Sequence, residues 1–180
     1  PAFNAAIADG VLRILAPSAG EYYFSDGITL PDGCSIEGGS MLCGYPATGT
    51  RLVFAENVST CVTLTSGNNR TSILKDITVT RTGTPPSGSV GILTYEAYAV
   101  QLLNVNCVNH AILYQFYSRA VGGITANMMN CWGSQATEYF FDVDNWPELR
   151  IVGGRFGANG AGDSLSCESF FLIQGGDSAP

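Results

Sequence analysis

Ile77-Thr78-Val79 is the first of four tripeptides in this chain that place a polar residue between two neighbours suited to a buried position. The other three are Val105-Asn106-Cys107, Met129-Asn130-Cys131 and Gly154-Arg155-Phe156, and their last residues lie 28, 24 and 25 positions apart. A repeat of this length is typical of a solenoid, in which each coil buries its apolar residues only against neighbouring coils. The alternation of apolar and polar residues is that of a β-strand. The repeat therefore predicts a parallel β-helix.

The same spacing extends backwards to Leu52-Val53-Phe54, because Phe54 lies 25 residues before Val79. We expect the last residue of each repeat to point inward and to form one stack along the coil. That stack comprises Phe54, Val79, Cys107, Cys131 and Phe156. Crossovers between parallel strands of one sheet are nearly always right-handed. The predicted fold is therefore an all-β, single-stranded, right-handed parallel β-helix.

The first ten residues differ from the rest of the chain. Phe3 to Ala8 is rich in alanine and is followed by Asp9-Gly10, a combination that predicts a short helix ended by glycine. We expect residues 1–10 to form an N-terminal capping helix and residues 11–180 to form one β-helix domain. We also interpret the chain as a fragment of a longer protein whose C-terminal part is missing.

The composition excludes several classes of function. The net charge is −7 and the isoelectric point is about 4.4, whereas nucleic acids and anionic membrane surfaces are bound by basic patches. No apolar run approaches the ~18 residues that read as a membrane span. We therefore expect no nucleic-acid partner and no membrane insertion.

The cysteines and the single histidine give no sign of a metal site or another cofactor. Six cysteines are present, but Cys107 and Cys131 fall in the same inward position of successive repeats, which favours reduced thiols in the core over a disulfide framework. Their spacing matches no zinc pattern. His110, the only histidine, is interpreted as a corner residue hydrogen-bonded to the backbone. No cofactor is expected.

A resemblance to a known family is carried by residues 3–39, FNAAIADGVLRILAPSAGEYYFSDGITLPDGCSIEGG. This segment resembles the opening of the pectin-lyase-like right-handed β-helices, in which an Ala-rich helix, a strand and an aromatic pair precede the pattern LP-x-G-x-x-I-x-G. The matching positions are Leu30, Pro31, Gly33, Ile36 and Gly38. Within that superfamily the chain is most similar to phage tailspike and tail-fibre depolymerases. The motif covers roughly the first 40 residues, and only the coil period covers the remainder.

The resemblance implies a homotrimer on the surface of a virion tail. It also implies that the protein binds or cleaves a host-surface polysaccharide such as a capsule or a lipopolysaccharide O-antigen. Catalytic residues differ between members of this family, so no catalytic position is transferred by the motif.

The candidate catalytic residues are carboxylates between Glu138 and Trp146. If Phe141 and Val143 point inward, then Asp142 and Asp144 project together from the outer face. Two positions along a strand separate them by about 6.5–7 Å, and glycoside hydrolysis needs two carboxylates, one as acid and one as base or nucleophile. Glu138 is the third candidate. The alternative interpretation is a solvated strand face that ends in a turn.

The candidate substrate-binding residues are aromatic or charged. Flat aromatic rings suit the apolar faces of sugars. Trp146 is predicted on the outside, beside the carboxylates. Glu96 belongs either to an acidic groove or to a solvated loop, and the arginines are candidates for clamping an anionic sugar. The full substrate-binding set is Trp146, Trp132, Tyr139, Glu96 and Arg150, with Arg119 and Arg155 as further arginines. The scarcity of basic residues favours hydrolysis over β-elimination.

Three functions stay open from the sequence. The first is a phage spike that binds and depolymerises host polysaccharide. The second is a secreted microbial polysaccharide lyase or hydrolase, and the third is a structural or adhesive β-helix without catalysis.

Overall fold

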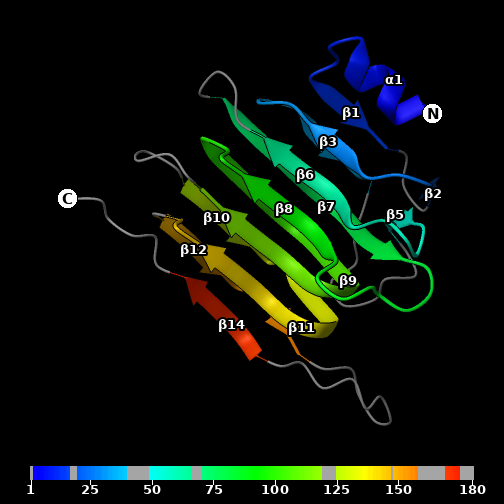
Figure 1. Cartoon of the computed structure of the whole chain (residues 1–180). Coiled ribbons are helices and arrows are strands. Elements are labelled where there is room, and N and C mark those ends of the chain that lie inside the picture. Colours follow the sequence, from blue (N-terminus) through cyan, green and yellow to red (C-terminus); the bar gives the residue numbers. More distant parts are fainter. Residues whose placement is uncertain are drawn as a thin grey trace.

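The computed structural model describes residues 2–16, 20–39, 49–65, 70–118, 125–146, 148–157 and 169–174. These residues form a parallel β-solenoid with one short helix, α1 (Ala2–Ala8), beside the first coil (Figure 1). The strands are β1 (Arg13–Leu15), β2 (Glu21–Phe24), β3 (Ile28–Leu30), β4 (Ser35–Glu37), β5 (Thr50–Phe54), β6 (Thr60–Thr65), β7 (Thr71–Arg81), β8 (Val90–Tyr95), β9 (Ala99–Tyr117), β10 (Thr125–Met129), β11 (Trp132–Asp144), β12 (Glu148–Val152), β13 (Arg155–Phe156) and β14 (Ser169–Gln174). The predicted all-β parallel β-helix with an N-terminal helix is confirmed.

The coils build three faces, in each of which six strand segments stack in parallel register. Face A contains β1, β4, the start of β7, the start of β9, β10 and β12. Face B contains β2, β5, the end of β7, the middle of β9, the start of β11 and β13. Face C contains β3, β6, β8, the end of β9, the end of β11 and β14. The long strands β7, β9 and β11 therefore run around corners of the solenoid.

The corner between faces A and B has a left-handed backbone residue in three successive coils. Asp76, Asn104 and Asn130 have φ angles of 53°, 52° and 51°. Asp and Asn are among the few side chains that tolerate this conformation. The Asn104 amide also donates a 2.8 Å hydrogen bond to Asp76 Oδ1. These residues therefore allow the bend by which the chain passes from face A to face B.

The predicted single stack of inward residues is wrong in register. Val79 does align with Cys107, but the row continues through Gly133 to Phe156. At the other end Val79 aligns with Leu52.

The two displaced residues, Phe54 and Cys131, are nevertheless buried in the core. Phe54 aligns with Arg81 instead, and Cys131 lies two positions before Gly133. Because side chains alternate along a strand, an error of two residues keeps the inward direction and changes only the row. The coils differ in length at their corners, so a constant spacing cannot give the register.

Residues 82–89 form the connection between β7 and β8, which carries the chain from face B to face C. Within the described ranges, no helix has the length and apolar character needed to cross a membrane.

Candidate functional site

The outward side chains of face C bring together two of the three predicted carboxylates. Phe141 and Val143 belong to the hydrophobic core, so the alternating residues Asp142 and Asp144 point outward from β11. Asp142 aligns with Gln115 of β9, and Asp144 aligns with Tyr117 of the same strand. The direction that the sequence predicted for the two aspartates agrees with the core packing.

Asp142 is an outward residue that is nevertheless only 5% exposed. Its Oδ2 accepts a 2.7 Å hydrogen bond from the Gln115 amide. Its Oδ1 is buried and has no hydrogen-bond partner among the residues that the structure describes. A buried polar atom without a partner is costly, by about 1–3 kcal/mol. Asp142 is therefore an unusual outward residue, a carboxylate with one unsatisfied oxygen beneath the surface of face C.

A pair of tyrosines lies in the neighbouring outward row of face C. Tyr95 and Tyr117 occupy successive coils, and Asp144 follows them in the same row. The two rings stack with their centroids 5.4 Å apart and their planes inclined by 12°. Both are partly exposed. They give face C aromatic surface and two phenol groups next to the carboxylates.

The candidate site predicted from the sequence contains neither these two tyrosines nor Gln115. The signal was their register: Tyr95, Tyr117 and Asp144 are equivalent positions of successive coils. That equivalence depends on the unequal coil lengths, which the constant spacing did not capture.

Glu138 holds a loop in place. Its Oε1 accepts hydrogen bonds from Ser87 Oγ at 2.7 Å and from the Gly88 amide at 2.8 Å. Ser87 and Gly88 belong to the loop between β7 and β8, so this carboxylate ties the third coil to the fifth. This anchoring gives Glu138 a structural task that differs from the predicted catalytic one. Tyr139, the next residue, aligns with Ile112 at the start of face C.

The prediction that Trp146 lies outside is wrong. Its side chain is only 9% exposed and packs edge-to-face against Phe116, with ring centroids 5.6 Å apart. The indole Nε1 donates a 2.9 Å hydrogen bond to the carbonyl oxygen of Glu148. Asn145, with a φ of 52°, turns the chain just before it. Trp146 therefore belongs to the core and cannot stack on a ligand.

The remaining predicted binding residues lie on different parts of the solenoid. Glu96 follows Tyr95 at the end of β8, and its amide donates to the Tyr117 carbonyl at 2.9 Å, so it borders the tyrosine pair. Trp132 lies on face B, in register with Asn106 and Arg155.

The predicted arginine clamp is not assembled by the described residues. Arg150 lies on face A and forms an ion pair with Glu148, at 2.5 Å. Arg155 lies on face B, whereas Arg119 lies outside the described residues.

His110 lies at a corner, as the sequence predicted, because it follows the left-handed residue Asn109, whose φ is 65°. Its side chain also has a charged neighbour that the sequence did not indicate. The histidine is buried, and its Nδ1 accepts a 2.9 Å hydrogen bond from Nε of Arg81, a guanidinium that is itself only 4% exposed. Burial first, and then the positive charge of Arg81, lower the pKa of His110 to about 3. Arg81 also donates to the Val58 carbonyl at 2.8 Å. His110 is therefore a neutral structural residue, remote from the outer surface.

The Cys61 thiol lies beside this buried pair, and the other thiols that the structure describes lie elsewhere in the core. Cys34, Cys61, Cys107 and Cys131 are free and buried, as the sequence predicted, whereas Cys43 and Cys167 lie outside the described residues. Burial raises the pKa of Cys61 to about 12 and that of Cys131 to about 11. In the part of the chain that the structure describes, no group of three or more His, Cys, Asp or Glu side chains is placed to hold a metal ion.

Comparisons of the chain with protein-family models, with curated proteins and with solved structures found no match.

Proposed function

We propose that face C binds a polysaccharide and that Asp142 and Asp144 hydrolyse it. The observation that carries this proposal is the outward row in which two stacked, partly exposed tyrosines lead to Asp144, with Asp142 in the neighbouring row. Sugars combine apolar C–H surface with many hydroxyl groups, and this face combines aromatic surface with hydrogen-bond acceptors.

The two aspartates would divide the chemistry according to their surroundings. Asp142, whose Oδ2 accepts a hydrogen bond from Gln115, would act as the acid after a rotation of its side chain that brings the buried Oδ1 to the surface and the glycosidic oxygen. Asp144 is more exposed, so it would activate a water molecule or attack the sugar directly. Their separation of about 6.5–7 Å, from two residues of strand rise, suits either stereochemical outcome.

The proposal extends to a phage tailspike whose target is host capsule or O-antigen. Its support is the similarity of residues 3–39 to the opening of that family, together with the parallel β-solenoid. We also propose that the spike is a homotrimer. Met129 and Val152 are exposed neighbours in one outward row of face A. Exposed apolar surface of this kind is commonly covered by a partner.

The test uses Asp142→Asn and Asp144→Asn with a panel of purified capsular polysaccharides and O-antigens, counting new reducing ends. Loss of either carboxylate should lower turnover by about 10²-fold or more, because general acid–base assistance contributes about 10²–10⁴-fold. Glu148→Gln is the matched control, because this carboxylate belongs to face A and pairs with Arg150.

Two results would contradict the proposal. One is parental cleavage by both aspartate variants, which would place the chemistry elsewhere. The other is the absence of binding to every glycan of the panel. Binding without new reducing ends would support the adhesive alternative.

A further inference from the structure

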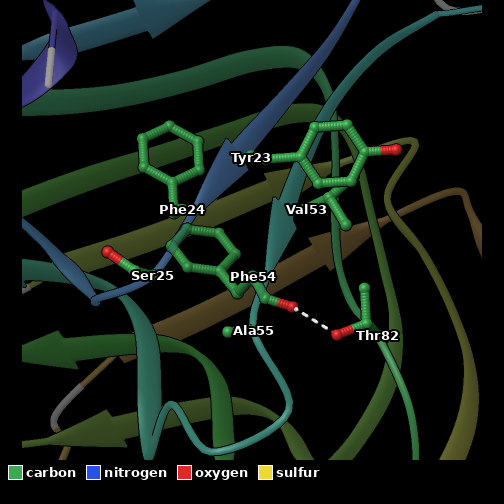
Figure 2. Close-up of a pocket in the computed structure, with 7 residues that line it drawn as sticks. All are labelled: Tyr23, Phe24, Ser25, Val53, Phe54, Ala55 and Thr82. Atoms are coloured by element: carbon green, nitrogen blue, oxygen red, sulfur yellow. Dashed lines mark hydrogen bonds between the residues drawn. The ribbon is translucent and has the colours of Figure 1, made fainter.

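A groove of about 420 Å³ opens near the N-terminal end of the solenoid, where β2 and β5 end (Figure 2). Tyr23 and Val53, outward residues of face B, line it together with Phe54 from the core side and Thr82 from the segment after β7. The volume lies within the range of small-molecule sites, about 300–1,000 Å³. The groove shares no residue with the candidate site on face C.

Tyr23 gives the groove a fixed aromatic wall. The residue is 67% exposed, so most of its ring surface is open to a ligand. Its hydroxyl donates to the carboxylate of Glu21, and the Arg51 guanidinium binds the same carboxylate from the next strand. Glu21 also raises the pKa of Tyr23, which keeps the phenol as a donor. A ring held at its tip loses little conformational freedom when a ligand packs on it.

The polar groups of the groove are hydrogen-bond acceptors. The Thr82 hydroxyl donates its hydrogen to the Phe54 carbonyl at 3.4 Å, as Figure 2 shows. The Ser25 hydroxyl, which also lines the groove, donates to Asp26 Oδ2 at 2.9 Å. A hydroxyl that has used its hydrogen keeps lone pairs that can only accept. In this arrangement both hydroxyls can accept hydrogen bonds from donors of a ligand.

No charged side chain is among the residues that line the groove, and Val53 and Ala55 give it apolar surface beside Tyr23. A matching ligand is thus neutral, has one flat apolar side and carries hydroxyl donors at its rim. A pyranose ring has these three properties, because its axial C–H groups form an apolar face and its hydroxyls lie around the edge.

We propose that this groove is a second carbohydrate site, which binds one neutral sugar ring against Tyr23. The proposal is independent of any hydrolysis on face C, because it uses other residues and no carboxylate as a reacting group. It gives the protein a contact with glycan at the N-terminal end of the solenoid.

The test is a titration of the ¹⁵N-labelled protein with methyl β-D-galactoside, methyl α-D-glucoside, lactose and maltose. At least one sugar should give saturable shifts at the amides of Ser25, Ala55 and Thr82. Tyr23→Ala should weaken that binding by about tenfold or more, the size of a lost aromatic stack. Tyr23→Phe keeps the ring but loses the hydrogen bond to Glu21. Its affinity for the sugar should therefore lie between those of the parent and of Tyr23→Ala.

Tyr98→Ala is the matched control, because Tyr98 is also an exposed tyrosine, at 41%, and does not line the groove. It should bind like the parent. Asp142→Asn should also bind like the parent, which separates this site from the one on face C. The proposal is overturned if no sugar gives saturable shifts at these amides or if Tyr23→Ala binds like the parent. Equal binding of cyclohexanol would also overturn it, because the groove would then be an apolar depression without preference for sugars.

Discussion

At the scale of single residues, the pair Arg81 and His110 places a charge inside the core. His110 is neutral in the folded protein because its pKa is lowered to about 3, whereas an unfolded histidine titrates near 6.5. As the pH falls, the unfolded chain takes up this proton first, so the contribution of His110 to stability is fully present above about pH 7 and is lost toward pH 3. We expect the free energy of unfolding to fall by about 2–3 kcal/mol from this group between pH 7 and pH 4.5. Urea denaturation at both pH values measures it.

His110→Gln is the control for this prediction. Glutamine can still accept a hydrogen bond from Arg81 but does not titrate, so other acidic and basic groups affect both proteins alike. The difference in unfolding free energy between the parent and His110→Gln should therefore shrink as the pH falls. A difference that stays constant from pH 7 to pH 4.5 would show that His110 is not the source of acid sensitivity.

Residue directions could be predicted from sequence only where they depend on local alternation. Asp142 and Asp144 point outward because Phe141 and Val143 are strand neighbours that belong to the core. Trp146 lies beyond the end of the strand, and the left-handed bend at Asn145 directs it inward. Glu138 binds a loop from a distant coil. Neither feature produces a periodic pattern in the sequence, so neither could be predicted from it.

At the scale of elements, the corner formed by Asp76, Asn104 and Asn130 decides whether a strand can pass from face A to face B. Asn104→Ala should cost about 2–3 kcal/mol, because alanine is strained by about 1–2 kcal/mol in the left-handed region and the bond to Asp76 is lost as well. Asn104→Gly removes the same bond but accepts a positive φ. Glycine should therefore be the milder substitution, as measured by urea denaturation.

Asn127→Ala serves as the comparison, because Asn127 is a partly exposed residue within β10 and not at a corner. It should change the unfolding free energy by no more than about 0.5 kcal/mol. Equal losses for Asn104→Ala and Asn104→Gly would mean that the hydrogen bond alone, and not the backbone conformation, sets the requirement.

The strands themselves could be predicted from the sequence, whereas their register could not. The tripeptide Met129-Asn130-Cys131 has the expected alternation, yet it spans a corner, with Asn130 at a φ of 51°. Which residues of the next coil pair with this tripeptide depends on the lengths of the turns before and after it. Face C, and with it the row of Tyr95, Tyr117 and Asp144, emerges only when those lengths are known.

At the scale of the whole molecule, each coil contacts mainly the coils next to it. The stability of the solenoid is therefore approximately a sum of contributions from single coils and from the interfaces between neighbouring coils. The N-terminal end of the solenoid is covered by α1, as Figure 1 shows. Phe3 of α1 is buried and packs edge-to-face on Tyr22 and Phe24 of the first coil, with ring centroids 5.4 and 5.3 Å apart. The central strand β9, by contrast, has neighbouring strands on both sides in all three faces.

This arrangement predicts a local response to the loss of Phe3. Phe3→Ala removes a buried ring, a change that costs about 3–5 kcal/mol in a closed core. In a solenoid, much of this loss of stability should appear as local unfolding of the N-terminal coil. Hydrogen exchange should therefore become faster in β1, β2 and β3 and stay unchanged in β9. Tyr23→Ala, an exposed residue of the same coil, should leave both regions as in the parent. Exchange that accelerates equally in β9 would show instead that the solenoid opens as one cooperative unit, with α1 stabilising every coil.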